Sequence, residues 1–303
     1  MGKALDNRST VAVHRRRFLT TATAAAGSAL LPETAWPATP PTPPQAFDLR
    51  NVDGKNYVTS VKDQDQPVAC NACTAFAVVA TVEATFNRKN KQSGNPATLG
   101  PNFDEMALFQ AASSGPGDVA SGGCGTSHWW PKYALARCQT SGLQWEGSSQ
   151  PPVRIAAFKS LLGEDGNQSA VNNLKKTQAN MKSWIASTGP VAAVMVQYED
   201  LFAWGQAWSA QHPGTSNPNV YTPGAALPAK RPAVAIVGGH VVAIVGYNDT
   251  GPTKYWICKN SWGAAWNGNG YVLIEQGRPG NAGPLGVGGC YIDLIDVWGV
   301  SIS

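Results

Sequence analysis

Charged residues are scarce in this 303-residue chain, since Asp, Glu, Lys and Arg make up only 14% of it against 43% hydrophobic residues. The formal net charge is +4, and the first 44 positions, with five basic and two acidic residues, account for +3 of it. The remainder therefore lacks the basic face with which nucleic-acid-binding proteins contact phosphates. The composition predicts a globular protein that does not bind nucleic acid.

Long uninterrupted hydrophobic runs are also missing. The most apolar stretch, AVAIVGGHVVAIVGY (residues 233–247), is broken by two glycines and His240 and is rich in Val and Ile. These features are typical of a buried strand rather than of a membrane span. We therefore expect no association with a membrane, and we expect the protein to be a monomer.

The N-terminal region predicts export. RRRFLTTATAAAGSALL (residues 15–31) has paired arginines before a mild, Ala- and Thr-rich stretch, and it resembles a twin-arginine signal peptide. A transit peptide is the alternative interpretation. We assign residues 1–38 to the signal and the Pro-rich residues 39–45 to a stiff linker. The periplasm or the extracellular space is the expected location.

Apolar periodicity divides the remaining chain into helices followed by strands. Helical spacing occurs from Ala75 to Phe86, in 102–112, after Pro131 and from Leu174 to Ile185. Strand patterns follow at 191–197, 240–247, 255–259, 270–275 and 290–295, and the Gly- and Pro-rich residues 208–231 read as an exposed loop. This order predicts an α+β fold with a mainly helical domain over 46–155 and a mainly β domain over 156–303.

Two strand-like runs flank the turn cluster NDTG and place a histidine near an asparagine. A hairpin centred on Thr250 sets His240 opposite Asn260. Directly opposed side chains on antiparallel strands lie about 4.5–5.5 Å apart at Cβ. The Asn oxygen can accept a hydrogen bond from one imidazole nitrogen and leave the other for chemistry. The alternative is that His240 is an ordinary buried histidine.

Six cysteines are present, and two of them stand three positions apart, Cys70 and Cys73. Cys73 lies just before the first predicted helix, where unpaired N–H groups favour a thiolate. Four interpretations are open: a redox pair, a zinc site with Cys124 and His128, two structural disulfides, or one bridged cysteine beside a free nucleophile. The redox interpretation lacks its usual βαβ context.

Four segments together resemble the papain-like cysteine peptidases, in an exported bacterial form. They are FDLRNVDGKNYVTSVKDQ (47–64), CNACTAF (70–76), GGHVVAIVGY (238–247) and YWICKNSWGAAWNGNGYVLI (255–274). Their order along the chain matches that of the family. The resemblance implies a helical left domain, an antiparallel β-barrel-like right domain and an active-site cleft between them.

The resemblance also implies the function and the roles of single residues. The protein would hydrolyse peptide bonds in peptide or protein substrates, without a cofactor or metal. Cys73 would be the nucleophile, His240 the general base and then acid, and Asn260 the residue that orients His240. Trp262 would shield their hydrogen bond. Gln64 would complete the oxyanion hole with the Cys73 N–H group, Gln66 being its rival. Cys70 would be bridged to Cys124.

Several positions depart from the family pattern. His240 and Asn260 follow Cys73 by 167 and 187 residues, whereas about 130–150 is usual. The excess predicts insertions, which we place in the Gly- and Pro-rich residues 113–123 and 210–230. Thr74 replaces an aromatic residue. About 30 residues separate the arginines from the mature-like start, too few for an inhibitory pro-domain, so we expect the enzyme to be kept inactive before export by an unformed Cys70–Cys124 bridge.

Two other functions use the same residues. A related transpeptidase or amidase would have the same nucleophile but a different acceptor, and a papain-like module without catalytic activity would only bind. The intact set of Cys73, His240 and Asn260 argues against the inactive module.

Overall fold

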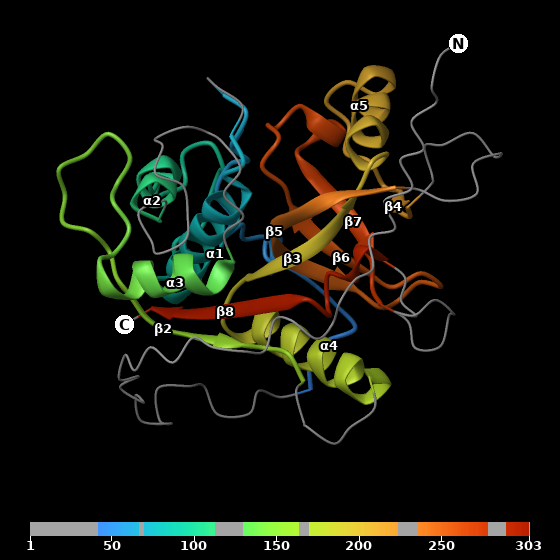
Figure 1. Ribbon diagram of the computed structural model, residues 1–303, viewed down its shortest axis with the longest axis horizontal. Helices are drawn as coiled ribbons and strands as arrows, with labels where there is room; N and C mark the ends of the chain where they lie inside the picture. The colour runs from blue at the N-terminus through green and yellow to red at the C-terminus, as the bar shows by residue number, and fades with distance from the viewer. Residues whose placement is uncertain are drawn as a thin grey trace, which may run out of the picture. The chain divides into compact units, whose positions relative to one another are not determined.

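Helices precede most of the strands along the chain, as the periodicity predicts (Figure 1). The computed structural model describes residues 42–66, 70–112, 130–163, 170–223, 235–277 and 289–302. Its α-helices are α1 (Cys73–Lys89), α2 (Glu105–Ala112), α3 (Pro131–Thr140), α4 (Ala170–Ser187) and α5 (Leu201–Gln211). Its strands are β1 (Ala46–Asp48), β2 (Ile155–Ser160), β3 (Val191–Tyr198), β4 (Val220–Tyr221), β5 (Ile236–Asn248), β6 (Tyr255–Lys259), β7 (Tyr271–Glu275) and β8 (Asp296–Ile302). Short 3-10 helices are η2 (Trp266–Gly268) and η3 (Gly289–Tyr291).

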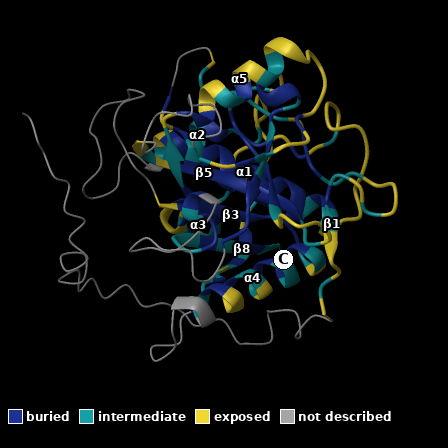
Figure 2. Cartoon of the chain, turned by 90° about the vertical axis from the view of Figure 1, so that its right-hand side faces the viewer, coloured by how far each residue is buried: buried dark blue, intermediate teal, exposed yellow. Residues whose placement is uncertain are grey.

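Helix α1 is the central element between the other helices and the sheet. It is buried around almost its whole circumference, as its sequence of Ala, Val and Thr allows (Figure 2). Helices α2 and α3 pack on one side of it, and strands β3, β5 and β8 pack on another (Figure 1). A helix buried on all sides has its end fixed by several elements, which makes that end a rigid place for a reactive side chain.

The described strands form one sheet in the order β2-β8-β3-β5-β6-β7-β4, and β1 pairs with the end of β5. All of these pairs are antiparallel except β4 with β7. Strand β5 is the longest, and its first half pairs with β3 while its second half pairs with β6 and β1. Because strand β5 begins beside α1, the sheet and the helices meet along its first half.

Two large apolar clusters form the core. One lies among α1, α2 and α3 and includes Phe103, Leu135 and Leu143, all nearly inaccessible to solvent. The other lies around α4 and the sheet and includes Met181, Tyr247 and Trp256. The described residues nevertheless belong to one compact unit. Within the described part of the chain, no helix is both long and apolar enough to span a membrane.

A buried network of charged residues joins the helices to the sheet. The Glu83 carboxylate on α1 accepts hydrogen bonds from the Thr59 hydroxyl (2.6 Å) and the Phe103 N–H group (2.9 Å). Lys259, the last residue of β6, donates to the same Thr59 hydroxyl (3.0 Å). Burial lowers the pKa of Lys259 to about 8. The network thus fixes the end of β6, next to Asn260, against α1.

Most of the predicted elements are confirmed, but two predictions were wrong. Residues 290–295 form no strand, since η3 and a turn precede β8. Within this segment the side chains of Cys290 and Ile292 are buried. Because they stand two positions apart, their spacing matches the alternation of buried residues in a strand. Part of the predicted loop at 208–231 is the end of α5 and the short strand β4. Residues 224–231 of that loop lie outside the described part.

Helix α5 and strands β1, β2, β4 and β8 went unpredicted. Strands β1 and β4 have only three and two residues, too few to show a period. In α5, Gly205 interrupts the helical pattern because the Trp266 ring packs against it, 2.3 Å from where a Cβ atom would stand. The helix needs a glycine there for close packing, although glycine weakens the helical signal in the sequence.

Candidate active site

Cys73 is the first residue of α1, one step inside the helix rather than just before it as predicted. Its half-buried thiol accepts hydrogen bonds from the N–H groups of Val241 and Thr74. Burial raises the pKa of the thiol, and these hydrogen bonds partly oppose that change. The unpaired N–H groups and the dipole at the start of the helix also stabilise the thiolate, so they lower the pKa of the thiol as the hydrogen bonds do.

His240 and Asn260 form the hydrogen-bonded pair that the hairpin predicts. His240 Nε2 lies 2.7 Å from Asn260 Oδ1, and both side chains are buried, with exposed fractions of 3% and 4%. Because the Asn oxygen accepts, the proton is assigned to Nε2, which leaves Nδ1 for a reaction. Burial lowers the pKa of His240 to about 4, and the bond to Asn260 acts in the opposite sense.

The register that led to this pair was wrong, although the pair itself is present. His240 lies opposite Met195 of β3, not opposite Asn260. Lys259 of β6 pairs with Ala243 of β5. Closer to the turn, an irregularity between Ile244 and Gly246 changes the register of the two strands. Asn260 follows the last residue of β6 and reaches His240 diagonally, a separation that longer side chains can span.

Trp262 covers the imidazole of His240. The two rings are stacked, with centroids 4.8 Å apart and planes 24° from parallel. Trp262 is itself held by edge contacts from Trp266 and Phe202, with centroid distances of 4.9 and 5.4 Å. These rings keep water from the buried hydrogen bond and add to the burial that lowers the pKa of His240.

The structure separates the two candidate glutamines. Gln64 is buried, its Nε2 donates to the Cys70 carbonyl (2.8 Å) and its Oε1 accepts from the Ser261 hydroxyl (2.6 Å). Gln66 is exposed and lines a different cavity, together with Lys62 and Phe76. Sequence reasoning missed Ser261, although it stands between Asn260 and Trp262. Its hydroxyl fixes the orientation of the Gln64 amide.

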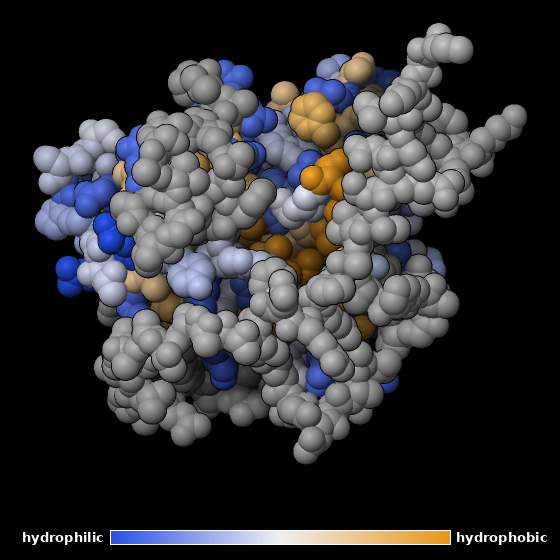
Figure 3. Space-filling view, viewed as in Figure 1, coloured by the Kyte–Doolittle hydropathy of each residue, from blue (hydrophilic) through white to orange (hydrophobic). Residues whose placement is uncertain are grey.

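A cavity of about 430 Å³ unites Cys73 and His240. The rest of its lining is mainly apolar or neutral: Asn71, Thr74, Trp130, Val194, Met195, Val196, Gly238, Gly239, Val241 and Ile295. Figure 3 shows hydrophobic residues gathered over β3 and β5 in the middle of this face. An apolar side chain fits such a cavity, whereas a charged one would lose hydration without gaining a partner.

Cys138, Cys258 and Cys290 are buried free thiols, so none of the three is paired. Cys70 is buried and is the one described cysteine that is not a free thiol. Its expected partner Cys124 lies outside the described residues, as do His128 of the zinc alternative and residues 113–123 of the first expected insertion. The signal and the first three residues of the linker, within residues 1–41, also lie outside.

The arrangement agrees with solved structures of papain-like proteins. The bromelain protease from Ananas comosus, solved in complex with the E64 inhibitor, aligns with a TM-score of 0.54 and 21% identity over 86% of this chain and 100% of that chain. The proCathepsin B S9 from Trypanosoma congolense aligns with a TM-score of 0.57 and 18% identity, over 86% of this chain and 78% of that chain. The predicted papain-like α+β fold is therefore confirmed.

Sequence comparison gives the family. The model of the papain family of cysteine proteases matches residues 43–284, and the chain belongs to that family. Cathepsin J of Rattus norvegicus is 28% identical over 240 residues, 76% of this chain and 60% of that protein. Cathepsin L2 of Homo sapiens is 26% identical over 248 residues, which are 79% of this chain and 63% of that protein. The chain thus spans somewhat under two thirds of the length of these relatives.

Two substitutions are expected to move the pKa of His240 in opposite directions. In a Cys73→Ala background, Trp262→Ala admits water and raises this pKa by about one unit or more toward its ordinary value. Asn260→Ala removes the bond that favours the imidazolium and lowers the pKa further. NMR titration of the imidazole signals measures both. Trp208→Ala is the control, since that indole stacks on His212 instead. Shifts of the same sign in the two variants would contradict this account.

Proposed function

We propose that the protein is a cysteine-type peptidase. The observation that carries the proposal is that His240, hydrogen-bonded to Asn260, and the half-buried Cys73 line one apolar cavity. A nucleophile, a base and a residue that orients the base are the parts that acyl transfer from a peptide needs. The substrates are peptides or proteins, and the apolar lining favours an apolar side chain next to the reacting bond.

The reaction proceeds through an acyl-enzyme. The Cys73 sulfur attacks the carbonyl carbon of the peptide bond while its proton passes to His240. The tetrahedral intermediate then collapses, the C–N bond breaks, and the imidazolium gives the proton to the leaving amine. Water, deprotonated by His240, attacks the thioester and releases the acid and the free thiol.

The reactive state is the Cys73 thiolate with the His240 imidazolium. Burial opposes each charge separately, because it raises the thiol pKa and lowers the imidazole pKa to about 4. Transfer of one proton between neighbouring groups creates both charges together, so that they stabilise each other in a poorly hydrated site. The start of α1 adds to the stability of the thiolate.

Labelling of the nucleophile tests the proposal. E64, the inhibitor bound by the related bromelain structure, should add its mass once to the native protein and never to Cys73→Ala, which should have no peptidase activity. Cys138→Ala removes a buried thiol outside the cleft and should keep both properties. Labelling or turnover that persists in Cys73→Ala would refute the assignment. Transfer of the acyl group to an added amine in place of water would instead indicate the transpeptidase alternative.

We assign the oxyanion hole to the Cys73 N–H group and the Gln64 amide. The support is that Gln64 is buried against Cys70 and Ser261, whereas Gln66 is exposed beside another cavity. Gln64→Ala should lower kcat by about 100- to 1,000-fold with little change in KM, because the donor acts mainly in the transition state. Gln66→Ala is the matched control and should change kcat by less than about threefold. Equal losses in the two variants would contradict the assignment.

We further propose a Cys70–Cys124 disulfide, since Cys70 is the described cysteine that is not a free thiol. A digest made without reduction should contain one linked pair of peptides with these two residues. Cys138, Cys258 and Cys290 should react with iodoacetamide only after unfolding. Alkylation of Cys70 in the unreduced protein would exclude the bridge.

The remaining assignments rest on the sequence. Residues 1–38 are proposed as a twin-arginine signal that directs the protein to the periplasm or outside the cell. The helical domain at 46–155 and the mainly β domain at 156–303 are proposed from the order of elements, with the two apolar clusters as support. A monomer is proposed as the functional unit.

A further inference from the structure

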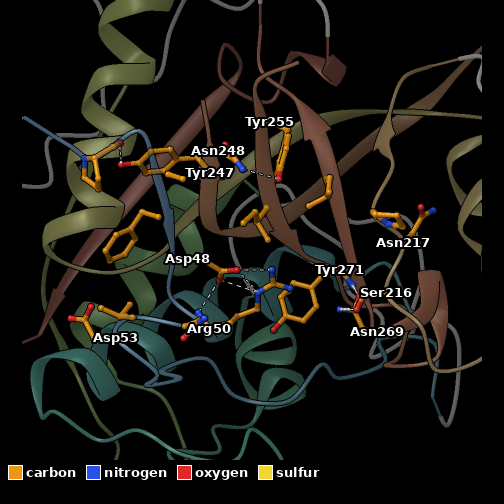
Figure 4. A pocket seen from close by; sticks show the side chains of 18 residues that line it. Asp48, Arg50, Asp53, Ser216, Asn217, Tyr247, Asn248, Tyr255, Asn269 and Tyr271 are labelled. Atoms are coloured by element: carbon orange, nitrogen blue, oxygen red, sulfur yellow. Dashed lines mark hydrogen bonds and ion pairs between the residues drawn. The ribbon is translucent and has the colours of Figure 1, made fainter. Parts of the chain in front are cut away.

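A second cavity, of about 680 Å³, lies apart from the cleft and shares no lining residue with it. Its walls come from residues 44–53, from β5, β6 and β7, and from residues 216–218 (Figure 4). The volume lies within the roughly 300–1,000 Å³ that is typical of ligand pockets. Neither Cys73 nor His240 contributes to it, so the peptidase reaction does not account for this cavity.

The walls are fixed by hydrogen bonds. On one side β1 pairs with the end of β5, and the Tyr247 hydroxyl donates to the Pro44 carbonyl (3.0 Å). On the other side Asn217 donates to Asn267 (2.8 Å), and Asn269 donates to Ser216 (2.7 Å). The cavity is therefore preformed and would require little ordering when a ligand binds.

The floor is the face of a sheet rather than its edge. Tyr255 and Ile257 of β6 and Tyr271 and Leu273 of β7 alternate along their strands and share this face. Their backbone N–H and C=O groups are used in pairing between β6 and β7, so a peptide cannot be bound here by addition of a strand. Recognition has to come from side chains, which here are flat rings and amides.

The charges within the cavity are largely neutralised. Arg50 donates to the Asp48 carboxylate through Nε (2.9 Å) and Nη2 (2.7 Å), and its guanidinium lies 4.4 Å from the centroid of the Tyr271 ring. Figure 4 shows Arg50 between Asp48 and Tyr271. The other charged residue of the lining is the carboxylate Asp53, which repels anions. An anionic ligand is accordingly disfavoured.

Several neutral hydrogen-bonding groups remain unused within the described residues. The Tyr271 hydroxyl and the Asn51 side-chain NH₂ have no partner there. The Tyr255 hydroxyl accepts from Asn248 (3.1 Å), and its own proton is available. Neutral donors and acceptors set beside half-buried tyrosine rings suit a ligand that carries both hydroxyl groups and apolar C–H faces.

We propose that this cavity binds a neutral oligosaccharide. Sugar rings pack their C–H faces on Tyr255 and on the apolar floor at Ile257 and Leu273. Their hydroxyl groups bond to Tyr271 and Asn51. The site holds a glycan, or the glycan part of a glycosylated substrate, independently of the reaction at Cys73.

Binding is measured by isothermal titration calorimetry with the full-length Cys73→Ala protein, which cannot cleave peptides under the proposed function. The probes are the neutral hexasaccharides cellohexaose, chitohexaose and maltohexaose, the anionic hexagalacturonate, and the peptide PATPPTPPQ of residues 37–45. At least one neutral saccharide should bind, and hexagalacturonate should bind at least about tenfold more weakly. The proposal would be overturned if none of the three neutral saccharides binds at concentrations up to 10 mM, a Kd that corresponds to a binding free energy of about −2.7 kcal/mol. It would also be overturned if the peptide alone binds.

Substitutions locate the binding. Tyr255→Ala should weaken it about tenfold or more by removing a ring face, and Tyr271→Phe should weaken it about threefold to tenfold by removing one hydroxyl. Tyr133→Ala removes an exposed tyrosine of α3 outside the cavity and should leave saccharide binding unchanged. Thermal unfolding must match among the three variants, and E64 labelling in the Cys73 form should stay intact in all. If neither Tyr255→Ala nor Tyr271→Phe changes the Kd for the saccharide, the assignment of binding to this cavity is wrong.

Discussion

The packing of α1 against β5 is the contact on which the rest of the structure depends. Ala77 of the helix lies against Val194 and Val241 of the sheet, and the Cys73 thiol joins the same small apolar cluster. Small side chains let the helix approach the strand closely, so that the Val241 N–H group lowers the pKa of the Cys73 thiol. Since His240 precedes Val241, one contact between helix and strand sets Cys73 and His240 beside the same cavity.

Polar interactions under the cleft hold this contact in place. Glu83, Thr59 and Lys259 connect α1, the N-terminal segment and β6, and Lys259 is followed directly by Asn260. Breaking one member of such a buried network leaves its neighbours unpaired at a high cost in free energy. The aromatic layer of Trp262, Trp266 and Phe202 then closes the other side of the His240–Asn260 pair. Buried charges and rings thus reduce the freedom of the His240 and Asn260 side chains.

Two cavities along one sheet differ in their chemistry. The start of β5 faces the helices and carries His240, in an apolar cavity poor in unused polar groups. Beyond it, β6 and β7 present tyrosines to the second cavity, and the segment from β1 to Arg50 adds a neutralised Arg50–Asp48 pair. The first environment favours a reaction between desolvated groups, whereas the second offers hydrogen bonds without net charge.

The sequence by itself predicted most of the helices and long strands and singled out the Cys70–Phe76 motif, because periodicity and local spacing are properties of neighbouring residues. It also predicted the His240–Asn260 pair, although from a hairpin with the wrong register. It did not determine the register, which depends on an irregularity in β5 that no local pattern reports. Nor did it separate Gln64 from Gln66 or find Ser261, since those roles follow from contacts between residues 197 positions apart. The second cavity was likewise beyond the sequence, because its walls meet only when residues 44–53 fold against β5, β6 and β7.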